Sequence, residues 1–153
     1  MSSFFGPAQL DLLIIVYRPG AAELHALGAC LAILPPTIRY SLALNAVQPE
    51  LPKGLELLLA DALLVQRNSE NLGYGRAANR LFKALPQPAP WVAVLNTDLH
   101  WQPGSFEALL VWLASQHDVV AAVPQILSPS GQVERLTKRD PSLFALCSRR
   151  FLP

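Results

Sequence analysis

Short apolar runs alternate with segments of helical periodicity along most of this chain. Residues 11–17 form a continuous apolar run with three β-branched side chains, which is typical of a strand buried on both faces. Similar runs, each bounded by proline, glycine or polar residues, predict further strands at 38–44, 63–66, 91–95 and 119–123. Prolines and capping residues delimit predicted helices at 21–34, 54–62, 75–85 and 105–116. A turn at 129–131 predicts a hairpin, and a last helix is expected at 142–151.

Strands that alternate with helices favour an α/β fold with a mostly parallel sheet and helices on both faces. A chain of 153 residues suits a single domain, which we expect over residues 1–153. In such sheets ligands bind beyond the carboxyl ends of the strands. The polar residues at those ends are therefore the candidates for chemistry.

The composition narrows the class of protein. Hydrophobic residues make up 52% of the chain and charged residues only 15%, which is a globular composition. The low charged fraction predicts that a partner, a membrane or a further segment covers part of the surface. The net charge of +1, without a dense basic run, argues against nucleic-acid binding. Cys30 and Cys147 match no metal-ligand spacing and are expected to be buried free thiols. Without a signal peptide or an apolar run of about 20 residues, the chain is expected to be cytoplasmic.

A glycine-containing turn stands between a predicted strand and a predicted helix. It runs from Asn71 through Gly73, Tyr74 and Gly75 to Asn79. Two glycines one residue apart permit a tight turn and a close approach of the backbone to a ligand. By itself this segment is better explained as a plain turn, because such turns are common and the third glycine of the dinucleotide fingerprint is missing.

A second polar segment, Asn96-Thr97-Asp98, directly follows the apolar run at 91–95. A carboxylate at a strand end can bind a divalent metal, and the metal can bridge and neutralise a diphosphate. Taken alone, Asp98 is also explained as a residue that caps its loop.

Together and in this order, the segments resemble glycosyltransferase family 2, especially its rhamnosyltransferase-like members. The resemblance covers residues 63–131 and several ordered motifs. The family pattern N-x-G-(F/Y)-(G/A) with a following Asn, then L-N-P-D, then P-G, is matched by Asn71-Leu72-Gly73-Tyr74-Gly75 with Asn79, by Leu95-Asn96-Thr97-Asp98, and by Pro103-Gly104. The resemblance implies a GT-A fold and an inverting transfer from a nucleoside-diphosphate sugar, UDP- or dTDP-linked, to a glycan or lipid-linked acceptor.

The same resemblance implies roles for individual residues. Asp98 would bind the metal, Mg²⁺ or Mn²⁺, with Asn96 beside it in the diphosphate site. Tyr17, at the end of the first strand, would lie near the base. The residues that would shape the nucleotide-sugar pocket are Asn71, Gly73, Tyr74, Gly75 and Asn79.

The chain departs from the family pattern at several points. Arg18-Pro19 follows Tyr17 where the family has Asn and a small or basic residue, and Thr97 replaces a proline. Asn45 stands where the family commonly has an Asp that binds the base; an amide can still pair with an imide edge. Family members continue past this length to an acidic pair that supplies the general base, so the catalytic residues are unassigned. Glu134 and Asp140 are supported by no motif.

Two other hypotheses remain beside the enzyme. The chain could be a non-catalytic remnant or partner module with the same fold, or an unrelated α/β nucleotide-binding protein. A short sheet would leave one edge open, which predicts self-association. The basic residues between 135 and 150 are most simply a solvated face, and they also allow peripheral contact with anionic lipid at the inner membrane face.

Overall fold

A computed structural model describes residues 7–46, 52, 54–128 and 130–134. The chain divides into two compact units, residues 1–110 and residues 111–153. The first unit contains the whole parallel sheet, and the second contains a short hairpin. The expectation of one domain over residues 1–153 stays a prediction.

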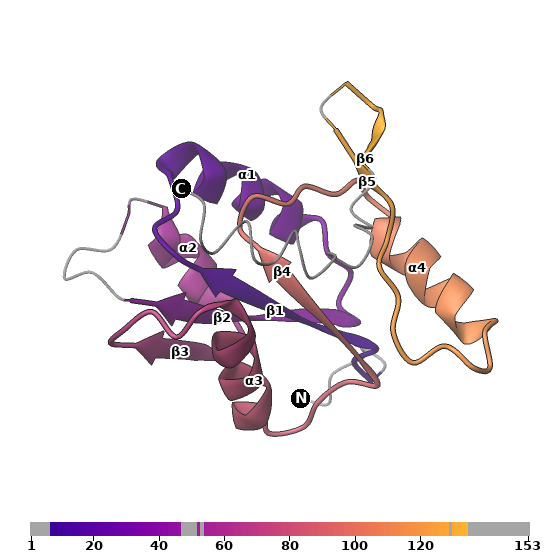
Figure 1. Ribbon diagram of the computed structural model, residues 1–153, viewed down its shortest axis with the longest axis horizontal. Coiled ribbons are helices and arrows are strands. Elements are labelled where there is room, and N and C mark those ends of the chain that lie inside the picture. Colours follow the sequence, from indigo (N-terminus) through magenta and orange to yellow (C-terminus); the bar gives the residue numbers. More distant parts are fainter. Residues whose placement is uncertain (1–6, 47–51, 53, 129, 135–153) are drawn as a thin grey trace, which may run out of the picture. The chain divides into compact units, whose positions relative to one another are not determined.

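The first unit is built on a four-stranded parallel sheet (Figure 1). Its strands stand in the order β3-β2-β1-β4. The central strand β1 is buried along its entire length, as its continuous apolar run predicts. Its register aligns Ile14 with Leu42 on one side and with Leu95 on the other. The strands are β1 (Leu10–Val16), β2 (Ile38–Asn45), β3 (Val65–Asn68) and β4 (Trp91–Asn96).

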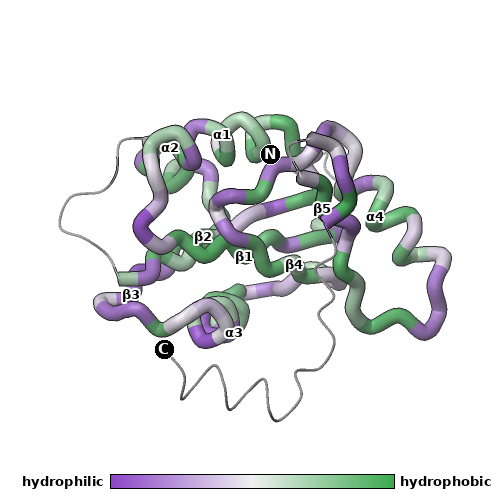
Figure 2. The backbone as a smooth tube through the Cα atoms, turned by 45° about the horizontal axis from the view of Figure 1, so that its top comes forward, coloured by the Kyte–Doolittle hydropathy of each residue, from purple (hydrophilic) through white to green (hydrophobic). Residues whose placement is uncertain are grey.

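Helices cover both faces of this sheet, which confirms the predicted α/β architecture. Figure 2 shows α1 (Ala21–Ala32) and α2 (Leu55–Ala60) over one face and α3 (Tyr74–Ala84) over the other. Alternate residues of β1 serve the two layers because successive side chains in a strand point to opposite faces. Leu12 and Ile14 belong to the core beneath α1 and α2, whereas Leu13 and Ile15 belong to the core beneath α3.

Most predicted elements are confirmed, with two differences. β3 begins two residues later than the predicted strand at 63–66. The predicted strand at 119–123 is wrong: this segment forms no strand, and Val120 is 94% exposed. An apolar run becomes a strand only where a neighbouring strand accepts its backbone hydrogen bonds, and none of the described residues does so here.

The remaining elements lie near or beyond residue 105. Helix α4 (Ser105–Ala114) begins at Ser105 as predicted. β5 (Ile126–Leu127) and β6 (Val133–Glu134) pair antiparallel, which confirms the hairpin predicted around the turn at 129–131. The helix predicted at 142–151 lies outside the described residues, as does Cys147.

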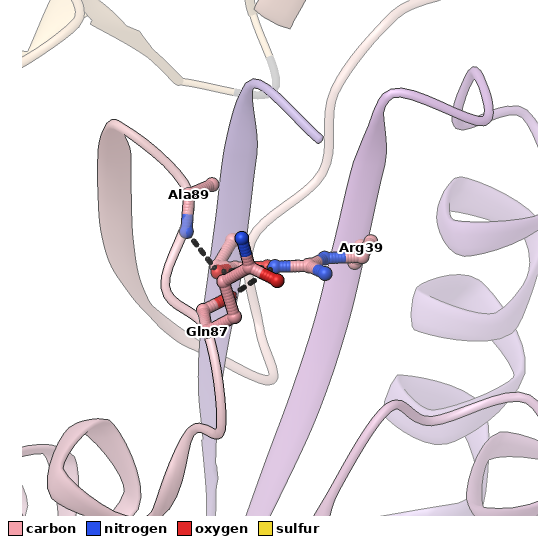
Figure 3. Close-up of polar contacts among 4 residues, drawn as sticks. Arg39, Gln87 and Ala89 are labelled. Atoms are coloured by element: carbon pink, nitrogen blue, oxygen red, sulfur yellow. Dashed lines mark hydrogen bonds and ion pairs between the residues drawn. The ribbon is translucent and has the colours of Figure 1, made fainter. Parts of the chain in front are cut away.

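A polar cluster lies at the amino-terminal ends of β1 and β2 (Figure 3). Asp11 of β1 is 1% exposed. It accepts hydrogen bonds from Arg39 Nε at 2.8 Å, from Arg39 Nη2 at 2.9 Å and from the Ala89 N–H at 2.7 Å. Arg39 Nη2 also donates to the carbonyl of Gln87 at 3.0 Å. The pair thereby ties the proline-rich connection into β4 to the first two strands.

Three smaller expectations concern surface and burial. Cys30 is a buried free thiol, as predicted. β4 has one neighbour in the described sheet, and its Val94 is exposed, but self-association stays a prediction. Among the described residues, no helix has the length and apolar character needed to span a bilayer.

Candidate functional site

The strand order places a topological switch point between the carboxyl ends of β1 and β4. From β1 the chain proceeds through α1 to β2 and then to β3 on one side, and it returns through α3 to place β4 on the other side of β1. Ligands of open α/β sheets bind at such a point of reversal. Tyr17 follows β1 and Asp98 follows β4, and Ile15 pairs with Asn96, so both predicted site residues lie just beyond two neighbouring strand ends.

The loop that follows β1 carries an aromatic ring and a cation. Tyr17 is 42% exposed, and the guanidinium carbon of Arg18 lies 5.3 Å from the centre of its ring. Arg18 has a φ of 48°, a left-handed conformation that is uncommon for a residue other than glycine and is frequent at functional sites. An exposed ring can stack on a base, and the neighbouring guanidinium can attract a phosphate. In the sequence Arg18 is only a departure from the family pattern, because a positive φ at a non-glycine residue leaves no sequence signal.

The end of β2 is joined to the glycine-containing turn by an amide network. Asn45 is 4% exposed, and its Nδ2 donates to Asn71 Oδ1 at 2.8 Å. Its Oδ1 accepts from the Leu72 N–H at 3.0 Å and from Asn68 Nδ2 at 3.5 Å. Asn71 Oδ1 also accepts from the Gly73 N–H at 2.9 Å. The structure therefore brings together Asn45 and Asn71, two residues of the predicted site, and the contact of Asn45 with a base stays a prediction.

Asn68 is a member of this network that the sequence analysis missed. It is the last residue of β3 and is fully buried, next to the last residue of β2 in the register. A polar residue that ends a strand beside another such residue was the available signal. The network sets the entry angle of the chain into α3.

Helix α3 opens with unpaired backbone donors. Gly73 is its N-cap, with φ 74° and ψ 167°, a conformation essentially restricted to glycine. The first intrahelical bond runs from the Ala77 N–H to the Gly73 carbonyl, so the N–H groups of Tyr74, Gly75 and Arg76 have no intrahelical acceptor. Such a helix start favours anions, and a Cβ on Gly75 would meet nothing within 4 Å. Asn79 is exposed further along the same helix.

The loop after β4 carries the second motif and faces the first. Asn96 and Asp98 are exposed, whereas Thr97 between them is buried. Burial raises the pKa of the Tyr74 phenol, and the negative charge of Asp98 raises this pKa further. This electrostatic effect joins one residue of each motif, Tyr74 and Asp98, which are 24 residues apart in the sequence.

The donor groups suit a metal that arrives with its ligand. The described residues contain no group of three or more His, Cys, Asp or Glu side chains able to hold a metal alone. Mg²⁺ is commonly held by one or two carboxylates together with substrate phosphates and waters. The exposed carboxylate of Asp98, with the amide oxygen of Asn96 nearby in the chain, fits that arrangement. Metal binding by Asp98 stays a prediction.

Neither candidate for a general base gains support from the structure. Glu134 is exposed in β6, which belongs to the second unit. Asp140 lies outside the described residues. The catalytic residues remain unassigned.

The fold defines a class of protein: an open α/β sheet whose strand order reverses between β1 and β4, with the start of α3 and the exposed Asp98 carboxylate beyond the strand ends. No protein-family model matches the chain. The chain is similar to the N-acetylglucosaminyl-diphospho-decaprenol L-rhamnosyltransferase of Mycobacterium tuberculosis, in strains CDC 1551 / Oshkosh and ATCC 25618 / H37Rv. In both comparisons it is 29% identical over 144 residues, which cover 88% of this chain and 47% of the relative.

This similarity confirms the resemblance to rhamnosyltransferase-like glycosyltransferases that the motifs indicated. The parallel sheet with its surrounding helices is consistent with the GT-A-like fold that the resemblance implied. The chain spans about half the length of the curated relatives that it matches.

Proposed function

We propose that this chain forms the donor-binding portion of a glycosyltransferase that takes a sugar from a nucleoside diphosphate. One observation carries the proposal: the carboxyl ends of β1 and β4 lie side by side at the point where the strand order reverses, which brings Tyr17 and Asp98 to the same end of the sheet. This arrangement gathers an anion-binding helix start and a metal-suited carboxylate at the place where α/β sheets bind nucleotides.

Each part of the site has a role in this proposal. The ring of Tyr17 stacks on the base, and the helix start at Tyr74 and Gly75 orients the diphosphate. Asn71 and Gly73 hold the turn that aims this helix, and Asn79 borders the sugar pocket. A divalent cation, Mg²⁺ or Mn²⁺, held by Asp98 with Asn96 beside it, would neutralise the departing diphosphate.

The reaction that this site would serve is an inverting substitution at the anomeric carbon. An acceptor hydroxyl oxygen forms the new bond to that carbon while the bond to the diphosphate oxygen breaks and its electron pair leaves with the diphosphate. A general base receives the hydroxyl proton. The described residues supply the donor half of this chemistry.

The donor and acceptor classes rest on the relatives. Their printed name specifies an L-rhamnosyl transfer to a diphospho-decaprenol-linked N-acetylglucosamine. For this chain we extend that to a UDP- or dTDP-linked sugar, rhamnose among them, and to a lipid-linked glycan acceptor. A lipid-linked acceptor also favours peripheral contact with the inner membrane face.

Calorimetry with UDP and with dTDP, each with Mn²⁺ and with EDTA, tests the donor site. The wild-type chain should bind one of them in a metal-dependent manner, and Asp98→Ala should lose that binding. Asp61→Ala removes another exposed carboxylate, just beyond the end of α2, and serves as the matched control with wild-type affinity.

A second candidate is a non-catalytic partner module with the same fold. The observation that favours it is the amide network, because both polar atoms of Asn45 are engaged by the protein at the position where the family binds the base. A folded wild-type chain that binds neither nucleotide would support this candidate over the enzyme.

A further inference from the structure

A single carboxylate links the loop after β1 to the loop after β4. Glu23 lies in the first turn of α1, and its Oε2 accepts a hydrogen bond from the Gly20 N–H at 3.3 Å. Its Oε1 accepts a hydrogen bond from the hydroxyl of Thr97. Gly20 ends the loop that carries Tyr17 and Arg18, and Thr97 stands between Asn96 and Asp98. The two carboxylate oxygens of Glu23 therefore bond to two different loops, one to the loop after β1 and one to the loop after β4.

Thr97 contributes a buried side chain to this link. Thr97 is 5% exposed although its two neighbours in the chain are exposed, so its side chain points into the protein while theirs remain accessible. A hydroxyl bonded to a carboxylate is a charge-assisted hydrogen bond, which is stronger than a neutral one. Thr97 directly precedes Asp98, so this bond anchors the residue next to the predicted metal ligand.

Thr97 is also a point where this chain departs from the L-N-P-D pattern that it resembles. A proline at this position has no hydroxyl and could not bond to Glu23. The departure is thus matched by a partner 74 residues away in the sequence. This pairing is a feature of the chain's own residues.

We infer that Glu23 and Thr97 are positioning residues that hold the Asp98 loop against the β1–α1 loop and so set the affinity of the site for its divalent metal. The inference rests on the proposed function, because it concerns the metal that accompanies the donor. Partners that orient a metal ligand typically change metal affinity or activity by roughly 10–100-fold when they are removed.

The test uses the full chain, four single-substitution variants and the double variant that combines Thr97→Val with Glu23→Gln. Thr97→Val and Glu23→Gln each weaken the link, whereas Thr97→Ser keeps the hydroxyl. Glu56→Gln is the matched control: Glu56 is the acidic residue in the first turn of α2, is exposed, and forms no side-chain hydrogen bond to another described residue. Binding of UDP or dTDP is measured by calorimetry over a series of Mn²⁺ concentrations.

We expect Thr97→Val and Glu23→Gln to raise the Mn²⁺ concentration for half-maximal nucleotide binding roughly tenfold, with affinity recovering at saturating Mn²⁺. Thr97→Ser should restore the wild-type Mn²⁺ dependence within about twofold, and combining the two substitutions should add little to either, because both break the same link. A merely structural role would instead lower nucleotide affinity equally at every Mn²⁺ concentration, and that result would overturn the inference.

A second readout does not depend on nucleotide. In a two-dimensional amide NMR spectrum, Thr97→Val should shift the Gly20 resonance, and Glu56→Gln should leave it in place. An unchanged Gly20 resonance in Thr97→Val overturns the inference even if the donor site is real. Absence of nucleotide binding by the wild-type chain, with the Gly20 shift present, overturns the proposed function and with it the assignment of the link to metal binding.

Discussion

Asp11 lies near the amino ends of the strands and Asp98 lies beyond their carboxyl ends, and the two carboxylates differ in burial and in hydrogen-bond partners. Asp11 is buried at the amino-terminal edge, where two guanidinium bonds and one backbone N–H satisfy its carboxylate. Asp98 is exposed at the carboxyl edge, and no side chain among the described residues forms a hydrogen bond or ion pair with it. A carboxylate whose bonding capacity is used within the protein stabilises the fold, whereas one left accessible beside a helix start can bind a ligand.

The two edges also differ in their backbone. The carboxyl edge holds the left-handed Arg18 and Ala46 and the strained N-cap Gly73. Such conformations are held in place by surrounding structure and concentrate at functional sites. The amino-terminal edge instead uses a buried ion pair to fix the connection into β4. The stabilising ion pair thus lies at the amino ends of the strands, and the predicted binding residues lie at the carboxyl ends.

The largest effect on stability should come from removing Arg39, the ion-pair partner of the buried Asp11 carboxylate. Arg39→Ala leaves the Asp11 carboxylate buried without its countercharge, and the free energy of unfolding should fall by about 3 kcal/mol. Urea denaturation measures this loss, and nucleotide affinity below the transition should be unchanged. Arg80→Ala, at an exposed position of α3, should change stability by less than about 0.5 kcal/mol. Equal stability of the two variants would refute the structural role of Asp11.

At the other edge, Asp98→Ala should show the opposite pattern. Its free energy of unfolding should stay within about 0.5 kcal/mol of the wild type because the side chain is exposed and bonds to no described residue. Affinity for nucleoside diphosphate with Mn²⁺ should fall roughly 100-fold, or about 2.7 kcal/mol. Denaturation and calorimetry on the same preparation separate the two effects. Destabilisation comparable with that of Arg39→Ala would end the contrast between the aspartates.

The two glycines of the turn offer a finer comparison within the carboxyl edge. Gly73→Ala should destabilise the chain by about 1–2 kcal/mol because an L side chain is strained at φ 74°, although the added Cβ has room. Gly75→Ala, inside the helix and also with room, should stabilise it by about 0.5 kcal/mol. If the backbone at Gly75 approaches the diphosphate, Gly75→Ala should nonetheless weaken nucleotide binding. Thermal unfolding with calorimetry checks both, and a neutral Gly73→Ala would contradict the strain.

The smallest effect is a titration. Asp98→Asn removes the nearby negative charge, so the pKa of Tyr74 should fall and its phenol should ionise at lower pH, while burial still keeps this pKa above its ordinary value. Absorbance of tyrosinate measures it, with Tyr74→Phe subtracted. Asp61→Asn should act instead on Tyr40, whose pKa is raised by burial and by Asp61. A Tyr74 titration indifferent to Asp98 would separate the two motifs.

Local pattern determined most of the framework. The continuous apolar run of β1 and the proline boundaries of α1 and α3 specify their elements because burial and backbone geometry act within a few residues. The segment at 119–123 has the same apolar character and forms no strand, because a strand also needs a partner that local pattern does not show. β3 was displaced for a related reason: its limits follow its pairing with β2.

For the site, the order of strands, turns and motifs along the chain, with the family resemblance that they carry, predicted Tyr17, Gly73 and Asp98 as candidates. The partners that these residues meet depend on the assembled sheet. The return of the chain through α3 places β4 beside β1, and that single topological choice brings Thr97 to Glu23 and Asp98 toward Tyr74. Contacts between residues 24 and 74 positions apart depend on the whole sheet being assembled, because parallel neighbours are joined only through distant crossovers.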